Sequence, residues 1–169
     1  MANFKDSKYF EVHDDYYTRP STLDMIIPYI PKDKVIWEPF LLNSNEQSKK
    51  YLQSKGFNVV GDNTINFFNH DLGEVLVGNP PFETEIKKRI LKRLVELDKP
   101  FILIMPTSKL NTSYIRENFK DSDDKLQIII PRKRIQFIKN GNELQNKCNF
   151  DCFYYCYKCN LERDIIWLD

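Results

Sequence analysis

The sequence has few glycines and histidines, almost no net charge and no long apolar run. Only 5 of the 169 residues are glycine, and no Gly-rich or Ser-rich linker divides the chain, so we expect a single domain over residues 1–169. The 25 basic and 24 acidic residues leave a net charge of +1. A protein that holds long nucleic acid through its whole surface is usually more basic, so any nucleic-acid contact must come from a local patch.

The apolar runs are short. The longest lie at 101–105 and 128–130, well below the roughly 18 residues of a membrane span, and residues 1–10 carry no apolar core of a signal peptide. We therefore expect a soluble, intracellular protein with no membrane partner and with reduced cysteines.

Four cysteines and two histidines are the only candidates for a metal site with soft ligands. Cys148, Cys152, Cys156 and Cys159 lie in or beside an aromatic run that is typical of a strand. Along a strand, Cys152 and Cys156 would be about 13 Å apart, too far to share one zinc ion. The two histidines are isolated. We expect core packing for the cysteines and no metal.

Strand and helix patterns alternate along the chain. Apolar runs predict strands at 35–37, 59–60, 67–68, 75–77, 101–105, 126–130 and 150–157, and periodicity predicts helices near 46–54, 84–97 and 114–119. Asn43 or Ser44 is expected to cap the first helix, and Thr84 the second. This order indicates an α/β fold with a mostly parallel seven-stranded sheet and helices on both faces. Ligands bind such sheets beyond the carboxyl ends of the strands, where Glu38, Asp62 and Asn79 fall.

Asn79-Pro80-Pro81-Phe82 follows directly after the strand expected at 75–77. The amine on C6 of adenine is a weak nucleophile because its lone pair is delocalised into the ring. The side-chain carbonyl of Asn79 and the backbone carbonyl of Pro80 can accept hydrogen bonds from its two N–H groups and so turn the lone pair toward a methyl donor. Pro80 and Pro81 restrict the backbone, and Phe82 offers a flat ring to an extruded base. An ordinary turn between strand and helix is the alternative.

This tetrapeptide resembles the motif of the adenine N6-methyltransferases, Asn/Asp/Ser-Pro-Pro-Tyr/Phe/Trp. The order of the other blocks is similar to that in small phage- and virus-type members, over roughly residues 14–158. The resemblance implies a Rossmann-like class I methyltransferase fold and S-adenosylmethionine as cofactor. It also implies methyl transfer to the N6 amine of adenine in nucleic acid, with DNA favoured over RNA.

Glu38-Pro39-Phe40 matches the acidic-Pro-Phe turn with which this family binds the methionine part of the cofactor. A carboxylate there can pair with the ammonium group. The family turn usually continues into Gly-x-Gly, which lets the cofactor approach the backbone, whereas this chain has Leu41-Leu42-Asn43-Ser44. This departure leaves open a surface turn with no ligand, or a weaker cofactor affinity.

Three further segments resemble parts of the cofactor site. Asp62 lies 24 positions after Glu38, near the place where Rossmann folds hold a ribose diol, although Asp-Asn is also a common turn. Asn66-Phe67 is similar to the segment that touches the adenine of the cofactor. Tyr16-Tyr17-Thr18-Arg19-Pro20 resembles a Tyr-Thr-Pro block that covers the cofactor, with Arg19 inserted, so residues 1–30 are expected to form a cofactor-covering segment. A helix start capped by Ser21 or Thr22 is compatible with that role.

The loop at 131–147 is the expected substrate loop. Arg132-Lys133-Arg134 and Lys139 make it basic, so it can contact phosphates. The segment from Arg134 to Phe137 resembles one that lies near the target-base pocket, so both residues are expected to bind substrate; a solvated loop is the alternative. Because no separate region is large enough for target recognition, this loop, a homodimer or a partner subunit must select the target.

Two other functions stay open. The substrate can be adenine in RNA rather than in DNA. Alternatively, the chain can be a catalytically inactive scaffold or nucleic-acid-binding subunit that keeps the methyltransferase fold, an interpretation favoured by the glycine-less turn after Phe40.

Overall fold

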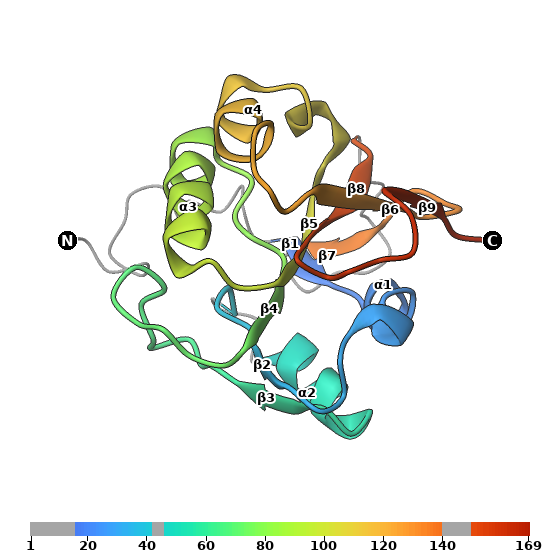
Figure 1. Cartoon of the computed structure of the whole chain (residues 1–169). Helices are drawn as coiled ribbons and strands as arrows, with labels where there is room; N and C mark the ends of the chain where they lie inside the picture. Colours follow the sequence, from blue (N-terminus) through green and yellow to red (C-terminus); the bar gives the residue numbers. More distant parts are fainter. Residues whose placement is uncertain (1–15, 42–45, 140–149) are drawn as a thin grey trace.

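A seven-stranded sheet forms the centre of the protein. The computed structural model describes residues 16–41, 46–139 and 150–169. The sheet strands are β2 (Val35–Trp37), β3 (Asn58–Val60), β4 (Val75–Gly78), β5 (Phe101–Pro106), β6 (Leu126–Ile130), β8 (Cys152–Tyr157) and β9 (Ile165–Trp167). Their spatial order is β3-β2-β4-β5-β8-β6-β9 (Figure 1).

The sheet is mostly parallel, as predicted. β3, β2, β4 and β5 pair in parallel, and β9 pairs in parallel with β6. Only β8 runs in the opposite direction, since it is antiparallel to both β5 and β6. The carboxyl ends of β2, β3, β4, β5 and β6 therefore meet at one edge of the sheet.

Helices cover both faces, which confirms the predicted architecture. α1 (Pro20–Asp24) and α2 (Gln47–Ser54) pack on one face, and α3 (Thr84–Leu97) and α4 (Ser113–Phe119) pack on the other (Figure 1). Alternate residues of β5 face the two layers: Ile102 and Ile104 contact the α1/α2 side, and Phe101 and Leu103 contact the α3/α4 side. This burial on both faces explains the continuous apolar run of β5.

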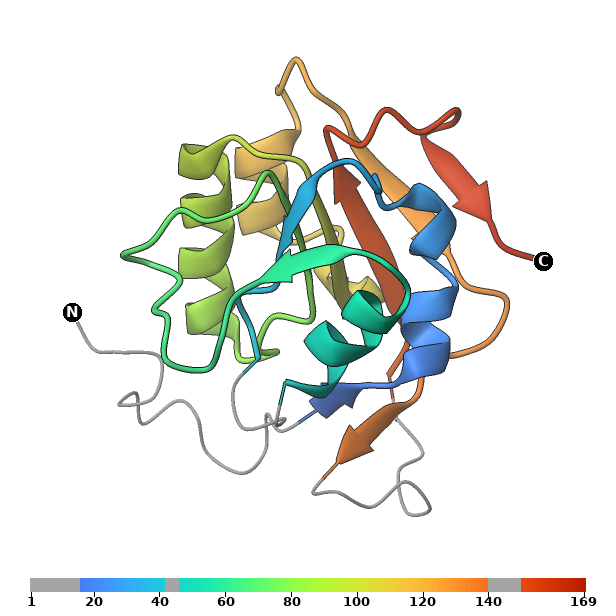
Figure 2. The same ribbon diagram turned by 90° about the horizontal axis from the view of Figure 1, so that it is seen from below.

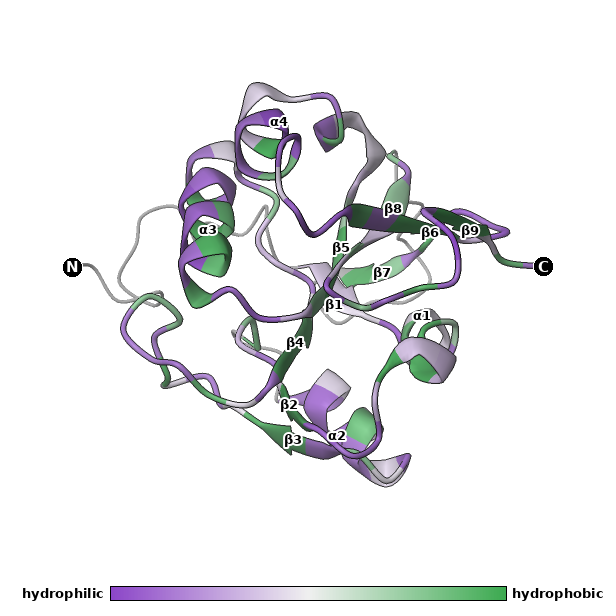
Figure 3. Ribbon diagram, in the orientation of Figure 1, coloured by the Kyte–Doolittle hydropathy of each residue, from purple (hydrophilic) through white to green (hydrophobic). Residues whose placement is uncertain are grey.

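α3 is amphipathic, as its periodicity predicts. Ile86, Ile90, Leu91 and Leu94 are buried against the sheet, and Figure 3 shows the hydrophilic side of the helix turned outward. The predicted cap was wrong by one residue. Glu83, not Thr84, is the N-cap, because its carboxylate accepts hydrogen bonds from the backbone N–H groups of Glu85 and Ile86.

One expected strand and one expected helix cap were wrong. Residues 67–68 lie in a turn, because side-chain oxygens bind the backbone there: Asp62 Oδ1 accepts from Thr64 N at 2.6 Å, and Asn66 Oδ1 accepts from Phe68 N at 2.9 Å. The seventh strand is instead β9 at the sheet edge. α1 begins at Pro20, with Arg19 as its N-cap, so neither Ser21 nor Thr22 caps it.

A separate two-stranded ribbon lies beside the main sheet. β1 (Tyr16–Thr18) and β7 (Phe137–Lys139) pair antiparallel, with Thr18 opposite Phe137 (Figure 2). The ribbon joins the predicted cofactor-covering segment to the predicted substrate loop. Residues 1–15 of the first and 140–147 of the second lie outside the described residues, as do the proposed caps Asn43 and Ser44. In the described ranges, no helix has the length and apolar character needed to cross a membrane.

Candidate active site

A pocket of about 430 Å³, partly open to solvent, brings most of the predicted site residues together. It lies at the carboxyl edge of the sheet, where β2 and β4 end. Eight of its lining residues were predicted from the sequence: Tyr17, Thr18, Glu38, Phe40, Asn79, Pro80, Pro81 and Phe82. Of the other two, Tyr16 belongs to the predicted Tyr-Thr-Pro block but was given no role of its own, and Ser48 was not predicted. The juxtaposition of three segments that are far apart in sequence is the main structural support for a site here.

Glu38 is a buried carboxyl group, only 4% exposed, at the end of β2. Its Oε1 accepts a hydrogen bond from the hydroxyl of Ser48 on α2, and its Oε2 is buried with no hydrogen-bond partner among the described residues. Burial raises the pKa of Glu38 to about 7, against smaller opposing effects of Ser48 and Lys49. A cationic ligand beside Oε2 would favour the charged carboxylate.

The backbone just after β3 and at the end of β4 lies very close to the turn that holds Glu38. A Cβ on Gly61, after β3, would lie 2.6 Å from the Glu38 carbonyl oxygen, and the φ of Gly61 is +118°. A Cβ on Gly78 would lie 3.0 Å from Cδ2 of Phe40. Glycine is therefore used beside this turn, although the turn itself lacks the expected Gly-x-Gly.

Asn79 is fixed in one orientation by the ribbon. Its Nδ2 donates to the backbone carbonyl of Tyr16 at 2.7 Å. Its Oδ1 is buried, with no hydrogen-bond partner in the described part of the chain. A buried amide oxygen without a partner is costly, and it is the group that the amine of a bound base would satisfy.

Phe82 sits in an aromatic cluster formed with Tyr16, Phe137 and Phe150. Its ring centroid lies 5.4 Å from that of Tyr16, 5.5 Å from that of Phe137 and 5.2 Å from that of Phe150. The stacking surface predicted for Phe82 is therefore already in contact with other rings. Phe82 is half-buried and still lines the pocket, so a base can reach only the part of its ring that these neighbours leave open.

Lys87 on α3 contacts Phe82 with its buried side chain, a role that was not predicted from the sequence. Its side chain is fully buried, with Nζ 3.3 Å from the Phe82 carbonyl oxygen and 5.0 Å from the centre of the Phe82 ring. A buried lysine must have partners of this kind.

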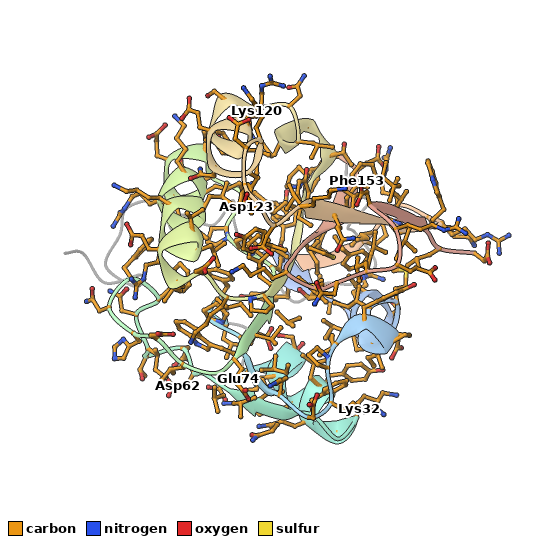
Figure 4. All side chains as sticks on the ribbon, viewed as in Figure 1. Lys32, Asp62, Glu74, Lys120, Asp123 and Phe153 are labelled. Atoms are coloured by element: carbon orange, nitrogen blue, oxygen red, sulfur yellow. The ribbon has the colours of Figure 1, made fainter. Side chains whose placement is uncertain are left out.

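Five residues predicted to bind cofactor do not line the pocket: Pro20, Pro39, Asp62, Asn66 and Phe67. Asp62 uses its carboxylate to order its own turn, and Figure 4 places it at the periphery of the molecule. The side-chain oxygen Oδ1 of Asn66 accepts a hydrogen bond from Phe68 N, so it is engaged rather than available for an adenine amine. Phe67 is fully buried and packs on Trp37 and Phe40, beneath the Glu38 turn.

The other predicted residues lie beside the pocket or outside it. Pro39 lies between the lining residues Glu38 and Phe40, and Pro20 begins α1 just after Thr18. Phe137 is buried in the aromatic cluster and touches Tyr16 and Phe82. Arg134 lies outside the pocket and pairs with Asp151, with Nε 2.7 Å from Oδ1.

Cys152 and Cys156 are buried in β8 as part of the core, and Cys159 is partly buried beside it; Cys148 lies outside the described residues. Among the residues that the structure describes, no three histidine, cysteine, aspartate or glutamate side chains are grouped as metal ligands.

The residues at the Glu38 end of the pocket have the chemistry to hold the amino-acid end of S-adenosylmethionine. Glu38 Oε2 is a buried acceptor suited to the ammonium group, and Ser48 holds the carboxyl from the other side. The adenosine end has less support, because Asp62, Asn66 and Phe67 are not among the lining residues.

Neither a protein-family model nor a curated protein matches the sequence. The structure is similar to that of a candidate RNA methyltransferase from Pyrococcus horikoshii, with a TM-score of 0.56 and 11% identity over 92% of this chain and 90% of that one. An antibiotic-related methyltransferase matches with a TM-score of 0.40 and 14% identity over 82% of this chain and 93% of that one, a likeness too weak to support any argument. At these identities the comparison concerns the fold alone. The chain has the α/β fold of a class I methyltransferase.

Proposed function

We propose that this protein transfers a methyl group from S-adenosylmethionine to the N6 amine of adenine in nucleic acid, with DNA as the favoured substrate. The observation that carries the proposal is the state of Asn79. Its amide is oriented by the Tyr16 carbonyl, so that a buried acceptor without a partner in the described residues stands in the same pocket as Glu38.

Different residues bind the cofactor and the adenine amine. Glu38 binds the ammonium group of the cofactor, which supplies an electrophilic methyl group when bound. Asn79 Oδ1 accepts from one N–H of the adenine amine, and the Pro80 carbonyl accepts from the other. With both hydrogens held, the nitrogen lone pair is available to the methyl group, and the hydrogen bonds cost little reorganisation because the groups are already placed. The aromatic cluster keeps water from this side of the pocket.

Substitution of Asn79 tests the mechanism. Asn79→Ala should abolish methyl transfer but leave the melting temperature shift caused by S-adenosylmethionine nearly intact, since Glu38 is untouched. Asn118→Ala is a matched control, because Asn118 Nδ2 also donates to a backbone carbonyl, that of Tyr114 at 2.6 Å, but outside the pocket. Normal transfer by Asn79→Ala would contradict the role of Asn79. No binding of millimolar S-adenosylmethionine by the wild type would contradict the enzyme proposal as a whole.

A further inference from the structure

A second, polar pocket of about 610 Å³ lies at the same edge of the sheet as the active-site pocket. Thr107, which follows β5, Pro131, which follows β6, and Cys152, which begins the antiparallel β8, all line it. Because these strand ends share one edge, the two pockets open toward the same side of the molecule.

The charge of this pocket is concentrated in two residues. Arg134 pairs with both oxygens of Asp151, at 2.7 and 3.3 Å, so these two charges cancel. Arg132 and Lys133 are exposed, and neither forms an ion pair with a carboxylate in the described ranges. The lining therefore carries two uncompensated positive charges, whereas the whole chain has a net charge of only +1.

The basic pocket is joined directly to the aromatic cluster of the active site. Phe150 contacts Phe82 at 5.2 Å between ring centroids, and the next residue, Asp151, lines the basic pocket. On the other wall, Arg134 is three residues before Phe137, which also contacts Phe82. A strand of nucleic acid with its adenine at Asn79 would have its neighbouring backbone within reach of this pocket.

We propose that Arg132 and Lys133 form a binding site for the phosphodiester backbone beside the target adenine. The inference rests on the proposed function, because that function places the target adenine in the neighbouring pocket. The basic pocket would bind phosphates and would not recognise the identity of the bases. Arg134 acts as a structural residue here: its ion pair with Asp151 holds the segment 131–134 against the start of β8. The net positive charge suits a polyanion, and its position beside a base-accepting pocket favours nucleic acid over an acidic peptide.

Charge removal at this pocket tests the proposal. The Arg132→Ala, Lys133→Ala double variant is compared with Lys32→Ala, Arg163→Ala, which removes the same two charge types from exposed positions. Lys32 precedes β2 and Arg163 precedes β9, at the opposite edge of the sheet, and Figure 4 shows Lys32 far from Phe153 of the basic pocket. All four side chains are exposed, so both double variants should melt like the wild type.

The probes are labelled dT and rU oligomers of about 12 nucleotides, a length that covers one binding domain, with their binding measured by fluorescence anisotropy at several salt concentrations. Two lost phosphate contacts should lower the slope of log affinity against log salt by about 1.4. At 0.1 M salt this is a loss of about 25-fold for Arg132→Ala, Lys133→Ala, with little difference remaining near 1 M salt. A greater loss with dT than with rU would indicate DNA as the source of the backbone, and the reverse would indicate RNA.

The control variant should bind like the wild type. Equal losses in both double variants, no loss in either, or no binding of dT or rU by the wild type would overturn the proposal. Polyglutamate that binds as tightly as the oligomers, with the same loss, would also overturn it in favour of an acidic peptide. Because these oligomers contain no adenine, their binding does not depend on the proposed reaction. If they bind as expected but adenine oligomers are never methylated, the basic pocket stands and the proposed reaction fails.

Discussion

Glu38→Gln removes a buried ionisable group but keeps its size and one hydrogen-bonding oxygen. Burial raises the pKa of Glu38 from its ordinary 4.5 to about 7, a difference worth about 3 kcal/mol at roughly 1.4 kcal/mol per pH unit. Below pH 4.5 the carboxyl is protonated in both the folded and the unfolded chain. Between pH 4.5 and 7 the unfolded chain loses its proton first, so the stability of the wild type falls as the pH rises. Above pH 7 both states are ionised and the loss is complete.

The glutamine variant has no such titration. Its free energy of unfolding, relative to that of the wild type, should therefore rise by about 3 kcal/mol between pH 4.5 and pH 8, as measured by urea unfolding across that range. Glu74→Gln is the control, because the exposed Glu74 has its pKa lowered, first by the hydrogen bond from Val35 N and then by that from Lys34, and so gives the opposite sign. A difference between Glu38→Gln and the wild type that stays flat with pH would refute the burial of an ionisable Glu38.

The affinity for the cofactor should also depend on the ionisation of Glu38. The ammonium group favours the ionised carboxylate, so the affinity of the wild type for S-adenosylmethionine should increase by up to about tenfold per pH unit from pH 5 to 7 and then level off. Isothermal titration calorimetry in buffers of different ionisation enthalpy would detect the released proton. Affinity independent of pH in the wild type would place the ammonium group elsewhere.

Two other substitutions test the surroundings of the pocket. Gly61→Ala should lower the free energy of unfolding by about 2–4 kcal/mol in urea, because it adds backbone strain and a close contact with Glu38. Gly56→Ala is the control: Gly56 also has a positive φ but has open space around it, so only the strain, about 1–2 kcal/mol, should be lost. Equal losses in the two variants would contradict the close packing at Gly61. Lys87→Met should change the free energy of unfolding by no more than about 1 kcal/mol, because loss of the contacts with Phe82 is offset by removal of a buried charge. Methyl transfer should fall, whereas the affinity for the cofactor should not. Unchanged transfer would show that Lys87 does not position the loop that holds Phe82.

Much of the fold and the centre of the site could be read from local sequence. Apolar runs with the right periodicity located six strands of the main sheet and three helices, because burial on one or two faces leaves a direct mark on the pattern. Glu38 and Asn79 could be placed together because both directly follow strands, and parallel strands end at one edge.

What the sequence did not reveal depends on contacts between distant segments. Ser48 and Lys87 have no local signal for a role in the site, and nothing local predicts that the Tyr16 carbonyl binds Asn79. Each of these contacts exists only because folding brings the residue beside Glu38, Phe82 or Asn79. The pairing of β1 with β7 links residues more than 100 positions apart. At residues 67–68 the apolar pair resembled a strand, but the chain turns there: Asn66 Oδ1 accepts a hydrogen bond from Phe68 N, and just before it Asp62 Oδ1 accepts one from Thr64 N.

The most direct test of the central claim is transfer of a labelled methyl group onto DNA and RNA oligomers, single- and double-stranded, followed by identification of the modified nucleoside by mass spectrometry. We expect N6-methyladenine as the product, with DNA as the better substrate, and loss of this product with Asn79→Ala. Transfer to another base, or to adenine at a ring nitrogen, would contradict the role given to Asn79 and Pro80, and absence of transfer to all four substrates would contradict the proposed function.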